Sequence, residues 1–242
     1  MTQTGGGVTQ TGGNAPISAR YVTVACVFVT CLILSNILAV KLLEFHGRVL
    51  DAGNVVFPVS YIIGDVLTEV WGFRAARRVI WTGFGCNLLA AAAIQAAIHL
   101  PPAGFWGDQK AYETILGFST RLLVASFCAF LVGEFVNSAI MARMKVLTEG
   151  RWLWTRTISS TVVAEALDST VFVTIAFAGA GVPLWNTIVT NWGFKTGYEI
   201  LATPLTYWVV GYLKRTEGVD VYDRDTPLVP IEFHRPAPAA QP

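Results

Sequence analysis

The chain has 242 residues, of which 53% are hydrophobic and only 14% are charged. A soluble domain of this length needs more charge to cover its surface, so the composition indicates an integral membrane protein. The formal net charge of +1 provides no large basic surface, and nucleic acid is therefore not an expected partner.

The two ends of the chain differ in composition from its middle. Met1–Ala19 is rich in Gly, Thr and Gln and has no charged side chain. It lacks the basic-then-apolar layout of a cleavable signal peptide, so a disordered lead is expected over residues 1–19. Residues 20–215 form the predicted transmembrane domain, and residues 216–242 form a predicted cytoplasmic tail with a Pro/Ala-rich end.

Long apolar runs predict six membrane-spanning helices. Each run is long enough to cross a ~30 Å hydrocarbon layer at ~1.5 Å per residue. The predicted fold class is therefore an all-α integral membrane protein, a bundle of six transmembrane helices. The expected helices are Tyr21–Leu43, Val55–Phe73, Val79–Leu100, Arg121–Met141, Ile158–Ala178 and Ile188–Leu213.

Basic residues alternate between the connections of these helices. They gather before the first helix, after the second, between the fourth and fifth, and after the sixth. Because Lys and Arg in short loops favour the cytoplasmic side, both termini are expected in the cytoplasm, and a bacterial inner membrane is the simplest location. The residues are Arg20, Arg74, Arg77, Arg78, Arg143, Lys145, Arg151, Arg156, Lys214 and Arg215.

Ionisable and amide side chains fall inside the predicted helices. A charged group at the bilayer centre costs about 2.5–3.5 kcal/mol on insertion scales. Such groups are therefore expected to face an aqueous site, to pair with each other or to hold a proton. The candidate substrate-binding residues are Asn36, Asp65, Glu69, Glu134, Asn137, Glu165, Asp168, Lys195 and Glu199.

Their spacing places many of them in pairs on one helix face. Asp65 and Glu69 are i, i+4, as are Lys195 and Glu199, and the pairs in the fourth and fifth helices are i, i+3. Alternatives remain open. The Glu69 side chain could extend to the cytoplasmic membrane interface near Arg74. The Lys195 side chain could extend to the outer membrane interface, or it could form a structural ion pair with Glu199. The deeper acids could simply hold helices together.

Enzyme chemistry has no clear basis in the sequence. His46, His99 and His234 lie at membrane edges or in the tail, which removes a Ser–His dyad and a His-ligated metal from the bilayer. Ile62–Asp65 resembles the Gly-x-Gly-Asp motif of aspartyl intramembrane proteases, but Ile62 replaces the first glycine. With no phosphate- or dinucleotide-binding glycine motif, we expect no enzyme, no cofactor and no metal.

Several phrases, in their order and spacing, resemble the queuosine precursor transporter family, which is also described as a vitamin uptake transporter family. The resemblance covers about Arg20 to Phe233. The phrases are Ser35–Lys41, Phe57–Phe73, Ala76–Arg78, Gly133–Ser138, Arg156–Thr161, Glu165–Ser169, Lys195 with Glu199, and Thr203–Tyr207.

The resemblance implies a fold like that of the substrate-binding subunits of energy-coupling-factor transporters. It also implies import of 7-cyano-7-deazaguanine, with 7-aminomethyl-7-deazaguanine as a second candidate, for the modified tRNA base queuosine. A deazaguanine is neutral and planar, and a carboxylate can accept its N1–H and amine donors together. Glu134 and Glu165, ahead of Asp168, are the acids predicted to do so.

Two other transport functions stay open at this stage. The chain could be a binding subunit that needs a separate energising module, or an ion-coupled carrier of another flat heterocycle, such as a purine or a vitamin. The expected partners are the small-molecule deazapurine and the lipid bilayer, and a homodimer is left open.

Overall fold

The computed structural model describes residues 8–11, 17–45, 48–117, 120–179, 181, 183–224 and 226–231, and these are mostly helical. The helices are α1 (Ala19–Leu38), α2 (Phe57–Trp71), α3 (Phe73–His99), α4 (Gln109–Leu116), α5 (Thr120–Leu147), α6 (Leu153–Phe177) and α7 (Leu184–Glu217). The shorter elements are β1 (Val8–Thr11), β2 (Leu42–Phe45), β3 (Arg48–Asp51), the 3-10 helix η1 (Ala52–Val55) and β4 (Val219–Tyr222).

Each of the six predicted segments corresponds to a long stretch of helix, but some bounds differ. The first helix ends at Leu38, and β2 occupies the end of the predicted segment and pairs with β3 in an antiparallel hairpin. Helix α4 was not predicted. Helix α6 begins at Leu153 rather than Ile158, so Arg156 lies in its first turn and not in a loop.

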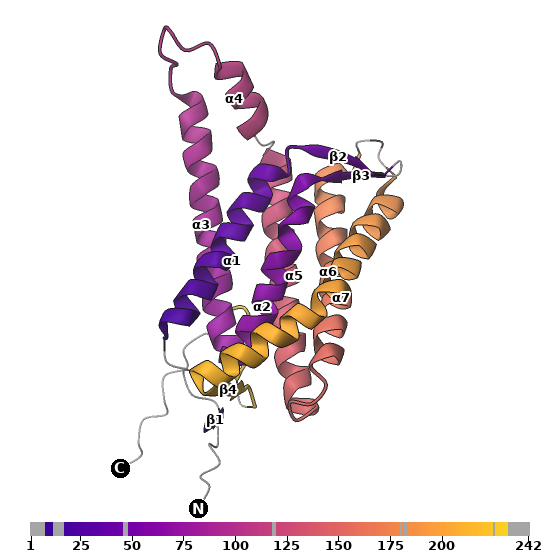
Figure 1. Ribbon diagram of the computed structural model, residues 1–242. Helices are drawn as coiled ribbons and strands as arrows, with labels where there is room; N and C mark the ends of the chain where they lie inside the picture. Colours follow the sequence, from indigo (N-terminus) through magenta and orange to yellow (C-terminus); the bar gives the residue numbers. More distant parts are fainter. Residues whose placement is uncertain are drawn as a thin grey trace, which may run out of the picture.

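The long helices run side by side, and their connections gather at two ends of the bundle (Figure 1). The α2–α3 and α5–α6 connections lie at one end together with β1 and β4, which we call the β4 end, and the β2–β3 hairpin lies at the other. Within the described residues, four helical segments are long and apolar enough to cross a membrane. They are α1, α3, the stretch Gln109–Leu147 that contains α5, and α6.

Helix α2 lies at the centre of the bundle, where it packs against α1, α3, α5 and α7. Pro58 occupies its first turn, where a missing backbone N–H costs nothing. The helix ends at Gly72, whose φ of 81° suits glycine. A Cβ at Gly72 would also come within 2.7 Å of Val221. This glycine therefore permits both the sharp α2–α3 turn and the close approach of β4.

The first part of the predicted C-terminal tail packs into the bundle. Val219 and Val221 of β4 are buried in the apolar core, and the Asp223 carboxylate accepts the Phe73 backbone N–H at 2.7 Å, which caps α3. Strand β4 also pairs in parallel with β1, a strand that the sequence did not predict. The rest of the expected N-terminal lead, apart from residues 17–19, and the Pro/Ala-rich end lie outside the described residues.

Candidate functional site

The distribution of polar and apolar side chains is inverted relative to a soluble protein. Large apolar side chains such as Leu89, Trp185 and Leu201 are mostly exposed on the outside of the bundle. Carboxylates such as Glu134 and Glu165 are fully buried inside it. This pattern is typical of a bundle that faces lipid and keeps a polar site in its interior.

The first part of this site surrounds Lys195 of α7, which is only 9% exposed. Its ammonium group donates a short hydrogen bond to Asp168 and lies 3.1 Å from Glu165 Oε2, so it bridges two acids of α6. The same ammonium lies 4.4 Å from the centre of the Phe57 ring of α2. Lys195 therefore pairs across helices, and not with Glu199 as one alternative had it.

Glu134 of α5 is buried near these groups. A Cβ on Gly64 of α2 would lie 2.8 Å from Glu134 Oε2, so the absence of a side chain at Gly64 makes room for the carboxylate. Neither oxygen of Glu134 has a hydrogen-bond partner among the described residues. Asp65, Glu165, Asp168 and Glu199 all lie within electrostatic range of it. Within the described residues, Glu134 is thus a buried acceptor without a donor.

Two further acids complete what we call the central carboxyl cluster. Asp65 accepts a 2.7 Å hydrogen bond from the Asn137 side-chain amide, and its second oxygen has no partner within the described part of the chain. Glu199 is 1% exposed, and both of its oxygens are likewise without a donor there. The central carboxyl cluster consists of Asp65, Glu134, Glu165, Asp168, Lys195 and Glu199.

The sequence missed several neutral members of this region. Tyr61 is 1% exposed, its hydroxyl has no partner among the described residues, and it lies against Gly133. The hydroxyls of Thr161, Ser169 and Thr196 are also buried and have no hydrogen-bond partner among the described residues. Spacing could have identified Tyr61 and Thr161, because each precedes a cluster acid by four residues and so shares its helix face.

Asn36 of α1 lies outside the central carboxyl cluster. Its amide donates to the Asn87 side chain at 3.0 Å, and its oxygen accepts from Ser126 at 3.1 Å. These bonds connect α1 to α3 and α5. Asn36 was predicted to contact substrate, whereas the structure places it in an amide link between helices.

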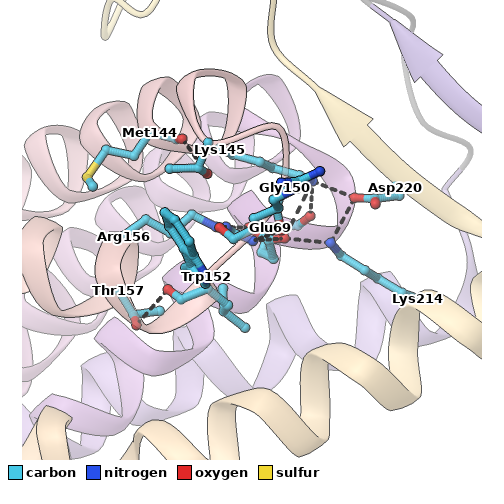
Figure 2. Close-up of polar contacts among 12 residues, drawn as sticks. Glu69, Met144, Lys145, Gly150, Trp152, Arg156, Thr157, Lys214 and Asp220 are labelled. Carbon is cyan, nitrogen blue, oxygen red and sulfur yellow. Dashed lines mark hydrogen bonds and ion pairs between the residues drawn. The ribbon is translucent and has the colours of Figure 1, made fainter.

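Glu69 also lies apart from the central carboxyl cluster, in a second group at the β4 end that Figure 2 shows. The Arg156 guanidinium of α6 donates to both Glu69 oxygens, at 2.7 and 2.8 Å. Lys214 of α7 donates to the same carboxylate at 2.5 Å. Lys145 of α5 donates to the Glu69 backbone carbonyl at 2.5 Å and to Asp220 at 2.6 Å. We call these five residues the Glu69 network.

This network corrects two expectations. Glu69 is 0% exposed and pairs with Arg156 and Lys214, so it does not share a site with the other acids. Arg156 and Lys145, which were counted with the basic connections, are 1% and 2% exposed and pair inside the bundle. At its outer edge, burial disfavours ionisation of Asp220, but Lys145 and Lys214 outweigh this effect and lower its pKa.

The buried acids of the described residues are not arranged as a set of metal ligands. Among the residues that the structure describes, no three His, Cys, Asp or Glu side chains are arranged so that they could hold a metal ion. The central carboxyl cluster is instead suited to hydrogen bonding, because it presents carboxylate and hydroxyl oxygens together with one ammonium group.

Apolar helices on the outside and a buried polar cluster inside indicate a multi-pass membrane protein. The family described as "Putative vitamin uptake transporter" matches residues 51–209, and the chain belongs to this family. The match contains all of the central carboxyl cluster and also Glu69 and Arg156. The family is one of transporters, which confirms the prediction that the chain is not an enzyme.

Three curated proteins carry similar sequences. The "Probable queuosine precursor transporter" of Bacillus subtilis is 28% identical over 72% of this chain and 77% of its own length. The "Queuosine precursor transporter" of Escherichia coli is 27% identical over 58% of this chain and 59% of its own length. The "Probable queuosine precursor transporter" of Haemophilus influenzae is 26% identical over 52% of this chain and 51% of its own length. No solved structure matches the chain.

Proposed function

We propose that this protein imports queuosine precursors across the inner membrane of a bacterium. The preferred substrate is 7-cyano-7-deazaguanine, with 7-aminomethyl-7-deazaguanine as the second candidate. The names of the three relatives support the substrate class. The observation that carries the proposal is that neither oxygen of Glu134, which is buried beside Gly64, has a donor in the described part of the chain.

Glu134 suits the donor edge of a deazaguanine. Its carboxylate can accept the N1–H and the exocyclic amine together, and hydrogen bonds to charged groups are the strong ones. Glu165 and Asp168, the other acids proposed for this role, already face Lys195. This pairing favours Glu134 as the acid that binds the donor edge, and it leaves Lys195 to donate toward the O6 side of the ligand.

Flat side chains lie beside the same acids. Phe57 and Tyr61 of α2 have ring centres 5.5 Å apart, and Lys195 lies over the Phe57 ring. Aromatic rings bind nucleobase-like faces by stacking and tolerate different substituents on the ring. Asn137 and Glu199 border the site, so a neutral planar heterocycle would meet acceptors at its edge and a ring at its face.

The proposed arrangement in the membrane is a bundle of six spans with both termini in the cytoplasm, similar in fold to substrate-binding subunits of energy-coupling-factor transporters. It is supported by the position of β1 and β4 together at one end of the bundle (Figure 1). Arg74, Arg143 and Arg151 lie in or beside the α2–α3 and α5–α6 connections at this same end, in agreement with the preference of basic loop residues for the cytoplasm. The homodimer stays a prediction.

Binding by the purified full-length protein tests the proposal. Calorimetric titration in detergent should show binding of 7-cyano-7-deazaguanine. Unsubstituted purine lacks the N1–H and amine donors on that edge and should bind at least about ten-fold more weakly. A loss of this size is expected for hydrogen bonds of about 1.4 kcal/mol or more. Equal affinity for the two ligands, or no binding of the deazaguanine, would overturn it.

A further inference from the structure

The central carboxyl cluster contains more acid than its lysine can balance. Lys195 lies against Glu165 and Asp168. Glu134, Glu199 and one oxygen of Asp65 have no donor within the described residues. Buried carboxylates this close together do not all ionise, because each negative charge raises the cost of the next. At least one of these groups therefore holds a proton when no other cation is near.

Glu199 differs from the other surplus acids in its place in the helix. It lies in α7 five residues before Pro204, which is inside the helix. Proline has no N–H to donate to the carbonyl of Ile200, so helical hydrogen bonding is interrupted directly after Glu199. A change of charge at Glu199 thus acts on the part of α7 that bends most easily.

The charged groups near Glu199 come from four helices. Asp65 of α2, Glu134 of α5 and Glu165 of α6 lie within electrostatic range of Glu199. Lys195 lies one turn earlier on α7, where it pairs with Glu165 and Asp168. The Tyr61 hydroxyl of α2 lies within range of Asp65, Glu134, Glu165 and Asp168. These acids come from α2, α5, α6 and α7. A proton needs only one free carboxylate oxygen, and within the described residues both oxygens of Glu199 are without a donor.

We propose that uptake is coupled to a proton, which Glu199 carries in from outside and releases inside together with each substrate molecule. The inference rests on the proposed function, because the substrate contacts the same cluster through Glu134. It assigns the two unpartnered glutamates different tasks. Glu134 accepts the donor edge of the substrate, and Glu199 exchanges a proton with the two aqueous sides as α7 moves.

Uptake by proteoliposomes tests this coupling. The full-length protein is reconstituted, and uptake of 7-cyano-7-deazaguanine is measured with and without an acidic outside, in sodium-free buffer. With one proton per substrate, a gradient of one pH unit should raise accumulation about ten-fold. A pH-sensitive dye inside the vesicles should report acidification only when substrate is added.

The decisive quantity is the accumulation of substrate with the pH gradient divided by the accumulation without it, measured on the same preparation. A change in the affinity of a variant for the substrate affects both measurements and therefore cancels from this ratio. Glu199→Gln should reduce this ratio to about one, while Glu113→Gln, at an exposed position of α4, should keep the parent value. If the Glu199→Gln variant fails to fold, the dye measurement on the parent decides.

The coupling would be overturned by a parent ratio of about one, by substrate entry without internal acidification, or by a Glu199→Gln ratio equal to the parent's. Accumulation driven by a sodium gradient instead would also overturn it. Failure of the proposed function itself is distinguishable, since the parent would then not bind the deazaguanine in detergent without any gradient.

Discussion

The central carboxyl cluster and the Glu69 network are both buried groups of charged side chains, yet their hydrogen bonding differs. In the Glu69 network, Lys145 makes three short bonds, to Glu69, Asp220 and Val221, and Glu69 accepts from Arg156 and Lys214. In the central carboxyl cluster, Glu134 and Glu199 have no donors among the described residues.

The difference separates a structural role from a binding role. A buried charge is tolerated where its partners are complete, and its removal then leaves those partners uncompensated. A buried acceptor without a donor costs stability in the ligand-free protein and is retained where a ligand supplies the donor. The Glu69 network therefore holds α2, α5, α6, α7 and β4 together, whereas the proposed role of the central carboxyl cluster is to bind the substrate.

The largest expected effect is the loss of stability when Glu69 becomes Gln. The change leaves Arg156, Lys145 and Lys214 without their shared anion, and breaking a buried pair in this way costs about 3–5 kcal/mol. Denaturant unfolding in detergent should show a loss of this size, and Glu113→Gln should unfold like the parent. A Glu69→Gln variant as stable as the parent would show that the Glu69 network does not stabilise the fold.

Glu134→Gln should show the opposite behaviour, with weaker binding and a fold as stable as the parent's or more so. Losing a charged acceptor of the deazaguanine donors costs about 1.5–3 kcal/mol of binding free energy, or one to two decades in affinity. Calorimetric titration and unfolding are measured on the same preparation. Unchanged affinity, or a loss of stability like that of Glu69→Gln, would contradict the assignment of Glu134.

Gly133→Ala should disturb the central carboxyl cluster by crowding. The new Cβ would clash with the Tyr61 hydroxyl and lie 3.1 Å from Asp168 Cβ, and overpacking of this kind costs about 1–3 kcal/mol. Gly85→Ala is the matched control in a helix, since a Cβ there meets no atom within 4 Å, and it should be neutral or slightly stabilising. Equal stability of the two variants would show that Tyr61 does not pack as described.

The smallest expected effect concerns Asp220, at the 32% exposed edge of the Glu69 network. Lys145 and Lys214 lower its pKa, so its stabilising contribution is present above the unfolded pKa of about 4 and is lost as pH falls through the lower folded value. Asp220→Asn should therefore reduce stability near neutral pH by less than about 1 kcal/mol, because solvent screens the pair.

This difference between Asp220→Asn and the parent should shrink as the pH falls below about 4, and it should disappear once the pH is below the lowered pKa of the folded protein, where the parent carboxyl is protonated too. Thermal unfolding across an acidic pH series measures it, with Asp108→Asn, an exposed position, as the control. A destabilisation by Asp220→Asn that grows on acidification would mean that Asp220 does not pair as an anion.

The positions of the long helices were largely predictable, because hydrophobic runs report burial in lipid or in the bundle directly. The start of α6 was not. Arg156 stands beside Trp152 and Trp154 in a basic stretch that favours a loop, and its partner Glu69 lies 87 residues earlier in the chain. Helix α4 was missed because eight amphipathic residues resemble a polar connection.

For the candidate site, spacing on each helix was enough to predict which acids share a face, but not which helices meet. Asp65, Glu134, Glu165, Asp168 and Glu199 do come together, whereas Asn36 and Glu69, equally polar and equally internal, belong to other contacts. The partner of Lys195 was not predictable either. Glu199 lies one turn away on the same helix, whereas Glu165 and Asp168 come close to Lys195 only because α6 packs against α7.

The most direct test of the central claim is an experimental structure of the complex with 7-cyano-7-deazaguanine. We predict that the ligand lies between α2, α5, α6 and α7, with its N1–H and amine within hydrogen-bonding distance of the Glu134 carboxylate, at about 2.7–2.9 Å between heavy atoms, and with the Glu69 network intact. A ligand bound at the Glu69 network, or bound elsewhere with Glu134 still lacking a donor, would contradict the account.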